Sequence, residues 1–70
     1  MMITTTFTVS GMTCQHCKMA VERALQELKG VTQIEVKLES GQVTVTYDQN
    51  SVQAQQIVET ITEAGYSVQK

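Results

Sequence analysis

The sequence contains no proline and no tryptophan, and only three of its 70 residues are aromatic. So few aromatic side chains cannot form a stacking platform for single-stranded nucleic acid. Positive charge is also sparse, because five Lys and Arg residues are outnumbered by seven carboxylates, which leaves a net charge of −2. The five cations are scattered along the chain and form no basic cluster. We therefore expect no nucleic-acid partner.

Long apolar runs are missing as well, since no uninterrupted run exceeds three residues. A membrane-spanning helix needs about 20 apolar residues, so we expect no membrane insertion. Residues 1–6 include neither the charged nor the apolar region of a signal peptide. These features predict a single domain over residues 1–70 in the cytoplasm, where reducing conditions keep thiols available.

Several segments alternate between apolar and polar residues at every second position, which is typical of strands. These segments are residues 3–9, 31–38, 43–47 and a short last one at 66–68. Between the second and third segments, the run Glu39, Ser40 and Gly41 predicts a hairpin turn.

Two other segments have apolar residues at helical spacing. In residues 15–29 these are Cys17, Val21, Ala24, Leu25 and Leu28. In the second helix, for which Ser51 is the predicted N-cap, they are Ala54, Ile57, Val58, Ile61 and Ala64. We expect Gly30 and Gly65 to end the two helices, and nearly all of these apolar residues to lie in the core.

The predicted order βαββαβ gives a ferredoxin-like α+β fold, with a four-stranded antiparallel sheet and two helices on one face. Because the elements alternate in direction, three connections meet at one end of the molecule. They are the loop 10–16, the hairpin 39–41 and the turn at Gly65 and Tyr66. We expect the function to lie there. The chain has a single histidine and places no second carboxylate at this end, so we expect no enzyme.

The most informative stretch is residues 11–17, Gly-Met-Thr-Cys-Gln-His-Cys, between the first strand and the first helix. Cys14 falls in the loop and Cys17 at the start of the helix. The unpaired backbone N–H groups of a helix start favour negative charge. The thiolate is the form of cysteine that binds metals and reacts as a nucleophile. This stretch therefore predicts a chemically active thiol pair.

Four interpretations of the two thiols are open. A closed zinc site needs four protein ligands, whereas the chain has two cysteines and one histidine. Thiol–disulfide oxidoreductases also use C-x-x-C at a helix start, but those of the thioredoxin type have a cis-proline beside it, and this chain has no proline. An inert pair would suit Cys17 better than the loop residue Cys14. A two-coordinate site for the soft ion Cu(I) fits both thiols, because it lets the metal leave by ligand exchange.

The same residues resemble a known family. The motif G-M-x-C-x-x-C of the heavy-metal-associated domain is matched by Gly11, Met12, Cys14 and Cys17. The resemblance covers the whole chain, and its C-x-H-C form is similar to that of bacterial CopZ-type copper chaperones. Tyr66 is similar to a tyrosine that those proteins have near the metal loop. Thr13, directly before the first cysteine, is similar to the residue that copper and mercury members have at this position, whereas zinc and cadmium pumps tend to have aspartate there.

Three residues are candidates for a supporting role around the thiols. Met12 could be a thioether ligand, but the resemblance implies a core plug beneath the loop. His16 could be a third ligand or bridge two molecules around shared copper, and we favour an exposed residue that tunes the thiols. Tyr66 could simply cover the edge of the core. Apart from the resemblance, only its predicted position at the same end as the loop makes it a candidate site residue. The remaining methionines, Met1, Met2 and Met19, are not spaced from the cysteines as ligands of the same metal ion would be.

The resemblance implies a carrier that binds one Cu(I) through Cys14 and Cys17. It also implies transfer of the copper by ligand exchange to the metal-binding domain of a copper-transporting P-type ATPase, or to a copper-responsive regulator. A copper-bridged homodimer is a further expected association. Three alternatives stay open: a metal-binding domain of a copper ATPase, a mercury-binding carrier, and a dithiol redox protein.

Overall fold

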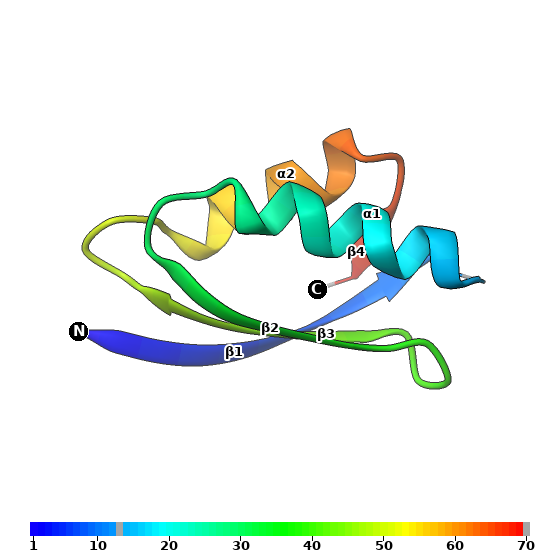
Figure 1. Ribbon diagram of the computed structural model, residues 1–70, viewed down its shortest axis with the longest axis horizontal. Helices are drawn as coiled ribbons and strands as arrows, with labels where there is room; N and C mark the ends of the chain where they lie inside the picture. Colours follow the sequence, from blue (N-terminus) through cyan, green and yellow to red (C-terminus); the bar gives the residue numbers. More distant parts are fainter. Residues whose placement is uncertain (13, 70) are drawn as a thin grey trace.

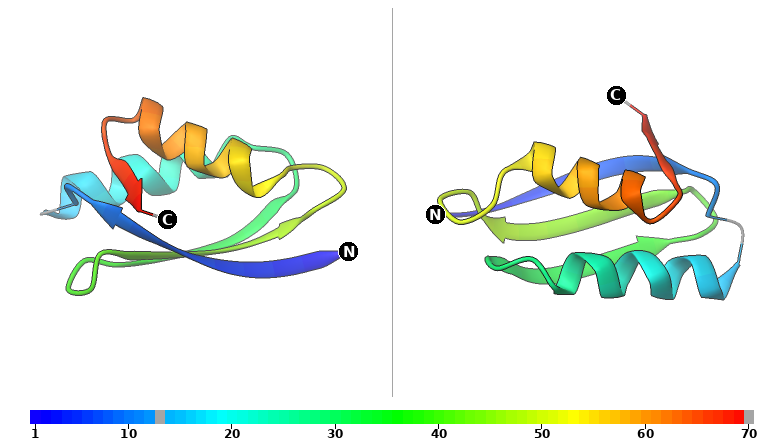
Figure 2. Two further views of the ribbon diagram at one scale, coloured as in Figure 1. Left: turned by 180° about the vertical axis from the view of Figure 1, so that it is seen from behind. Right: turned by 90° about the horizontal axis from the view of Figure 1, so that it is seen from above.

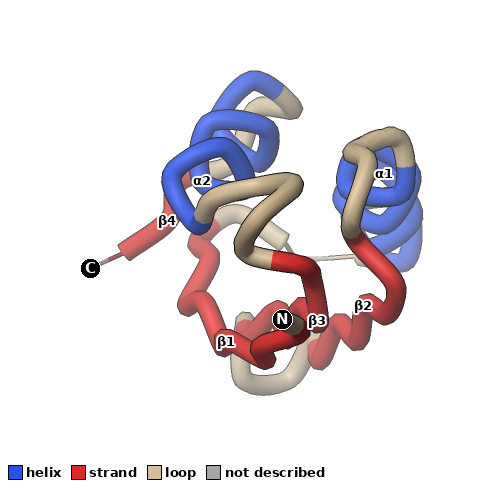
Figure 3. The backbone as a smooth tube through the Cα atoms, turned by 90° about the vertical axis from the view of Figure 1, so that its left-hand side faces the viewer, coloured by secondary structure: helices blue, strands red, loops and turns tan. Residues whose placement is uncertain are grey.

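The computed structural model describes residues 1–12 and 14–69, and its elements follow the predicted order. They are β1 (Met2–Ser10), α1 (Gln15–Gln26), β2 (Val31–Lys37), β3 (Gln42–Asp48), α2 (Ala54–Glu63) and β4 (Ser67–Gln69). The strands form one antiparallel sheet in the order β2-β3-β1-β4. Both helices cover the same face of this sheet (Figure 1), and Figure 3 shows the two layers end-on. The ferredoxin-like α+β fold is thus confirmed.

The core lies between the sheet and the two helices. The central strand β3 contributes every second residue, Val43, Val45 and Tyr47, as the predicted alternation requires. The helices contribute residues that lie one turn apart, namely Val21 and Leu25 from α1, and Ile57 and Ile61 from α2. Full burial of an aliphatic side chain stabilises a fold by about 1.5–3 kcal/mol, so this cluster is the main stabilising feature of a small domain.

The opposite face of the sheet is polar. Thr4 lies opposite Thr46 and Thr6 opposite Thr44 in the register of β1 and β3. Their hydroxyl oxygens are 2.9 Å and 3.2 Å apart, respectively, so each pair shares a hydrogen bond across the two strands. Cross-strand threonine pairs of this kind stabilise a sheet modestly. The face without helices is therefore held by hydroxyl groups as well as by the backbone.

Three connections meet at one end of the molecule, as predicted. The backbone N–H of Val9, near the end of β1, donates to the carbonyl of Gly41 in the hairpin at 2.7 Å. The Cα of Gly11 faces the ring of Tyr66, because a Cβ added there would lie 3.5 Å from Cδ1. Figures 1 and 2 show the start of α1, the β2–β3 hairpin and the turn after α2 together at this end, opposite the N-terminus.

The predicted start of the second helix was wrong by two residues. The N-cap is Gln53, whose backbone N–H donates to Oε1 of Gln56 at 2.9 Å, as in one arm of a capping box. Ser51 instead belongs to a tight turn that follows β3. Its N–H and that of Val52 both donate to the carbonyl of Asp48, at 2.9 Å and 3.0 Å. The turn buries Val52, a core residue that the periodicity did not include.

The first helix is shorter than predicted. It ends at Gln26, because the N–H of Leu28 bonds to the carbonyl of Leu25 at 3.1 Å, a tighter turn than the α-helical one. Gly30 does have a positive φ of 97°, but it closes the turn that leads into β2 and does not directly follow the helix. In the second helix, Ala54 and Ala64 were expected in the core and are exposed, because they lie at its two ends.

Candidate metal site

Cys14 and Cys17 lie at the start of α1 with their Sγ atoms 3.5 Å apart, and neither forms a disulfide. Cys14 is the N-cap residue and has an extended backbone, with φ −150° and ψ 171°. Its carbonyl accepts the N–H groups of Cys17 and Lys18, at 3.1 Å and 3.2 Å. The first turn of the helix therefore fixes both backbones, and the two sulfur atoms face each other.

The two thiols differ in their surroundings. Cys14 is exposed and, within the described part of the chain, its side chain makes no capping hydrogen bond. Cys17 is half-buried and packs against the core. The first turn of α1 contains no acidic residue, and Lys18 follows Cys17 directly. A helix start without carboxylates leaves its positive end available to thiolates.

Tyr66 is positioned beside this pair by the end of α2. The N–H of Tyr66 donates to the carbonyl of Ile61 at 3.3 Å, and that of Gly65 donates to the carbonyl of Thr62 at 3.0 Å. Together with the φ of 104° at Gly65, these two bonds form a Schellman motif. The motif fixes the backbone of Tyr66, whose half-buried ring packs against the core.

The environment of the Tyr66 hydroxyl links it to both cysteines. Side-chain hydrogen bonding with Cys17 raises the pKa of Tyr66 above its ordinary value of 10.0, with smaller contributions from burial and from the charges of Cys17 and Cys14. A hydrogen bond that keeps the phenol protonated has the hydroxyl as donor and the sulfur as acceptor. Tyr66 thus offers a proton donor to the inner thiol of the pair.

Met12 and His16 occupy opposite environments. The side chain of Met12 is buried and belongs to the core cluster, so it packs inward directly before the loop. His16 is exposed and lines a shallow hollow on the outer face of α1 with Met19, Ala20 and Arg23. Thr13, which the resemblance singled out, lies outside the described residues.

The structure therefore brings together some of the predicted site residues and separates one. Cys14, Cys17 and Tyr66 are adjacent in space. Met12, two residues before Cys14 in the sequence, packs into the core. Among residues 1–12 and 14–69, no group of three or more His, Cys, Asp and Glu side chains is arranged to hold a metal ion. His16 is thus not part of a preformed three-ligand cluster with the cysteines.

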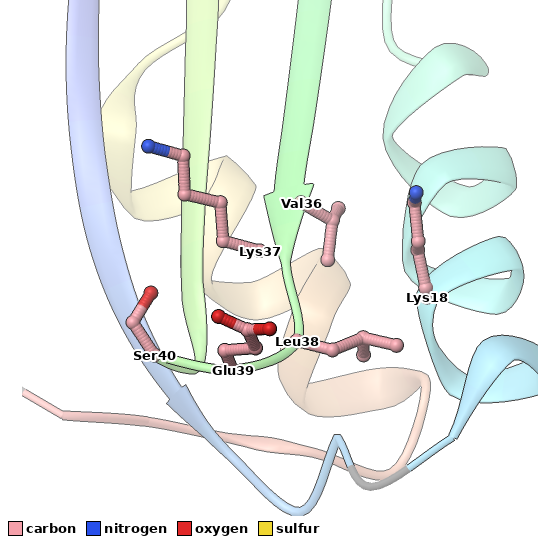
Figure 4. Close-up of a pocket in the computed structure, with 6 residues that line it drawn as sticks. All are labelled: Lys18, Val36, Lys37, Leu38, Glu39 and Ser40. Carbon is pink, nitrogen blue, oxygen red and sulfur yellow. The ribbon is translucent and has the colours of Figure 1, made fainter.

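A groove beside the loop end was not anticipated from the sequence. It runs between α1 and the segment that ends β2, and its lining residues are Lys18, Val36, Lys37, Leu38, Glu39 and Ser40. In Figure 4 the side chain of Leu38 points toward α1, and Lys18 stands on the opposite wall. The only signal for it in the sequence is the continuation of the apolar alternation of β2 to Leu38, one residue past the end of the strand.

Comparisons with known proteins agree on one family. The heavy-metal-associated domain matches residues 6–67. The copper chaperone CopZ of Staphylococcus haemolyticus is 49% identical over 67 residues, which cover 96% of this chain and 98% of that protein. A solved CopZ metallochaperone superposes with a TM-score of 0.94 at 45% identity, over 96% of this chain and 100% of that one. A copper-binding domain from HMA7, a P-type ATPase, superposes with a TM-score of 0.91 at 35% identity, over 94% and 89% of the two chains. Within the described residues of this chain, no helix is long and apolar enough to cross a membrane.

Proposed function

Because the chain belongs to the heavy-metal-associated domain family, we propose that it is a cytoplasmic copper chaperone. It would hold one Cu(I) between Cys14 and Cys17 and transfer the ion to a partner protein by ligand exchange. The relatives named copper chaperones, which match nearly the whole chain, support the copper-carrier role. This role involves no catalysis.

The observation that carries the proposal is the pair of sulfur atoms 3.5 Å apart at the exposed start of α1. Thiolate ligands select soft ions, of which Cu(I) is satisfied by two of them. If metal–sulfur bonds are about 2.3 Å long, as in zinc thiolates, a linear arrangement places the sulfurs about 4.6 Å apart. The Sγ atoms then separate by about 1 Å on loading. Cys14 is the residue free to make that movement, because it is exposed and precedes the helix.

The difference between the thiols suits transfer better than storage. An incoming thiolate can approach from the side of Cys14 and form a three-coordinate intermediate before either original bond breaks. The metal-binding domain of a copper P-type ATPase is the partner we favour, and a copper-responsive regulator is the other. The similarity to a copper-binding domain of such an ATPase supports the first, because the same fold would present a thiol pair in the same setting.

The neighbouring residues have distinct proposed roles. Met12 anchors the start of the loop in the core, so that Cys14 moves without unfolding the segment before it. Tyr66 donates to Cys17 and keeps that thiol in place. His16 tunes the pair through its charge from the outer face of the helix. The exposed Cys14 also permits a copper-bridged homodimer when copper exceeds protein.

A second candidate is a metal-binding domain of a copper ATPase, which the 35% identity to a domain of that kind favours. Such a domain would bind Cu(I) through the same two residues. The two roles are separated by a transfer assay: a chaperone delivers copper to the ATPase domain, and an ATPase domain receives it from a chaperone.

A metal competition experiment tests the proposal. Reduced protein is titrated with Cu(I), Zn(II) and Hg(II) in turn against a chromophoric chelator. We expect one Cu(I) per chain, bound far more tightly than Zn(II), and sulfur as the main scatterer in X-ray absorption. Cys14→Ser and Cys17→Ser should each weaken binding severely, whereas Ser10→Ala, a hydroxyl change at the end of β1, should not.

Three outcomes would contradict the proposal. Strong Cu(I) binding after loss of both thiols would place the ion elsewhere. A preference for Hg(II) in cells, with no copper bound, would indicate a mercury carrier. Rapid thiol–disulfide exchange with a substrate protein, without metal binding, would indicate a dithiol redox protein.

A further inference from the structure

We propose that His16 and Met19 form a second, weaker site for a soft monovalent ion such as Cu(I) or Ag(I), on the outer face of α1. The site is separate from the thiol pair and goes beyond the chaperone role. Both side chains line the same surface hollow, together with Ala20 and Arg23. Met19 is a large apolar residue with 47% of its surface exposed, so core packing does not account for its position.

The geometry of the helix brings the two donors together. Residues three apart on an α-helix are neighbours, with Cβ atoms about 5–6 Å apart. A helical methionine leans toward the N-terminus of its helix, onto the residues three and four positions before it. This lean would bring the thioether of Met19 toward His16, with which it lines the same hollow. Ala20 lies on the same face, and its small side chain leaves room for an ion between the two.

The chemistry of the donors selects the kind of ion. A thioether is a soft ligand that favours Cu(I), and imidazole also binds copper. Hard ions such as Mg²⁺ and Ca²⁺ prefer oxygen ligands and would find none in this pair. A soft ion that accepts two ligands needs no third residue. Neutral donors add no charge, however, so this site must bind more weakly than two thiolates.

Arg23 reinforces that difference in affinity. This residue lines the same hollow, and its positive charge repels a cation by an amount that salt screens only partly. The thiol pair also has a cation beside it, Lys18, but two thiolates bring negative charges that offset the charge of the ion. The ion should therefore occupy the cysteines first and the His16–Met19 site only when metal is in excess.

The test is a titration of the Cys14→Ser/Cys17→Ser double variant with Ag(I) in chloride-free buffer, followed by NMR of labelled methionine methyl groups. The chain has four methionines, and Met1 and Met2 are also exposed, so they report binding to any accessible thioether. We expect the methyl signal of Met19 and the ring signals of His16 to shift on one curve that saturates at one equivalent. The Met1 and Met2 signals should stay unmoved over that range.

Two variants and the native chain make the result decisive. Met19→Leu keeps the size of the side chain and should weaken Ag(I) binding, followed by the His16 signals, by about tenfold or more. His16→Gln should weaken Ag(I) binding, followed by the Met19 signal, by a similar factor. Met2→Leu is the matched control and should change neither. If the double cysteine variant does not fold, the native chain is used. There the first equivalent of Ag(I) should leave Met19 unmoved and the second should shift it.

Either of two results would overturn the proposal. One is a Met19 shift no larger than those of Met1 and Met2, and the other is a Met19 shift that His16→Gln leaves unchanged. Neither depends on whether the cysteines carry copper, so failure here leaves the chaperone proposal standing. If the native chain did not bind its first equivalent of metal tightly, only the chaperone proposal would fail.

Discussion

The hydroxyl of Tyr66 and the side chain of Cys17 share a hydrogen bond, and this bond raises the pKa of the tyrosine. Tyr66 follows α2 and Cys17 lies in the first turn of α1, so the bond joins the end of one helix to the start of the other. The Schellman motif after α2 holds the tyrosine backbone rigidly. The chemistry of the inner thiol is therefore linked to how α2 ends.

Replacing Tyr66 by Phe should move the ionisation of the inner thiol to higher pH. A hydrogen bond donated to a thiolate favours the charged form, so its loss should move the rise in thiolate absorbance to higher pH. An ultraviolet pH titration of reduced apoprotein measures this. Tyr47→Phe is the control, because its hydroxyl lies 3.3 Å from Thr5 Oγ1 and not at the thiol pair. An equal shift in both variants would show that the bond to Cys17 is not the cause.

Copper transfer should depend more on Cys14 than on Cys17. The exposed N-cap residue can follow the metal into an interface, whereas Cys17 is half-buried and bonded to Tyr66. Mixed with a two-cysteine partner domain and one equivalent of Cu(I), Cys17→Ser should still form a copper-bridged complex, and Cys14→Ser should form it poorly. Gel filtration with metal analysis distinguishes them. Equal loss in both variants, or the reverse order, would mean that the thiols are not divided in this way.

The fold should not need the metal. Its core is apolar and lies between the helices and the sheet, so reduced protein with a chelator should keep its helical circular dichroism, unlike a zinc finger. Leu25→Ala should cost about 2–5 kcal/mol of unfolding free energy in urea, because Leu25 is fully buried. Leu28→Ala makes the same change at a half-buried position and should cost less. Comparable costs, or a molten apoprotein, would contradict this view of the core.

The N-terminus should make stability depend on pH through Asp48. The N–H of Asn50 and the N-terminal ammonium group, at 3.0 Å and 3.1 Å from Oδ1, hold the pKa of this carboxyl below its ordinary value of 3.8. A lowered pKa in the folded state means that the stabilisation is present above about pH 4 and is lost as pH falls further. The effect should be small, since the pair is at the surface.

The melting temperature between pH 5 and pH 2.5 measures this dependence. The native chain should lose stability more steeply with acid than Asp48→Asn, and Glu39→Gln at the opposite end should behave like the native chain. Acetylation of the N-terminus should remove part of the difference. If Asp48→Asn follows the same curve as the native chain, the contacts of Asp48 contribute nothing to folding.

Periodicity was sufficient for the order of the elements but not for all of their ends. The alternation in β3 and the helical spacing of the apolar residues around Leu25 in α1 and Ile57 in α2 specify which faces are buried. Burial of a whole apolar face makes the largest contribution to the free energy of folding. The ends depend on single hydrogen bonds. Ser51 was a reasonable N-cap by residue type, yet its N–H donates to the Asp48 carbonyl in a turn. The N-cap is Gln53, whose own N–H donates to the side chain of Gln56.

The site was predictable to a similar degree. The spacing of Cys14 and Cys17 was enough to place both thiols at one helix start, and the order of elements placed Tyr66 at the same end. The sequence could not show that Tyr66 bonds to the inner thiol, because that depends on how the turn after α2 is closed. His16 is exposed, as expected, but the sequence did not show that it shares a surface hollow with Met19, because that depends on how the side chains on the outer face of α1 are arranged.

The molecule is elongated, with extents of 32 × 19 × 18 Å, and its N-terminus lies at the end opposite the start of α1 (Figure 2), where the sequence places both cysteines. A tether attached at Met1 would therefore point the thiols away from whatever surface it is fixed to. Sensor chips and affinity resins coupled through this terminus should keep the metal end accessible to partners. Coupling through the thiols themselves would hide that end against the support.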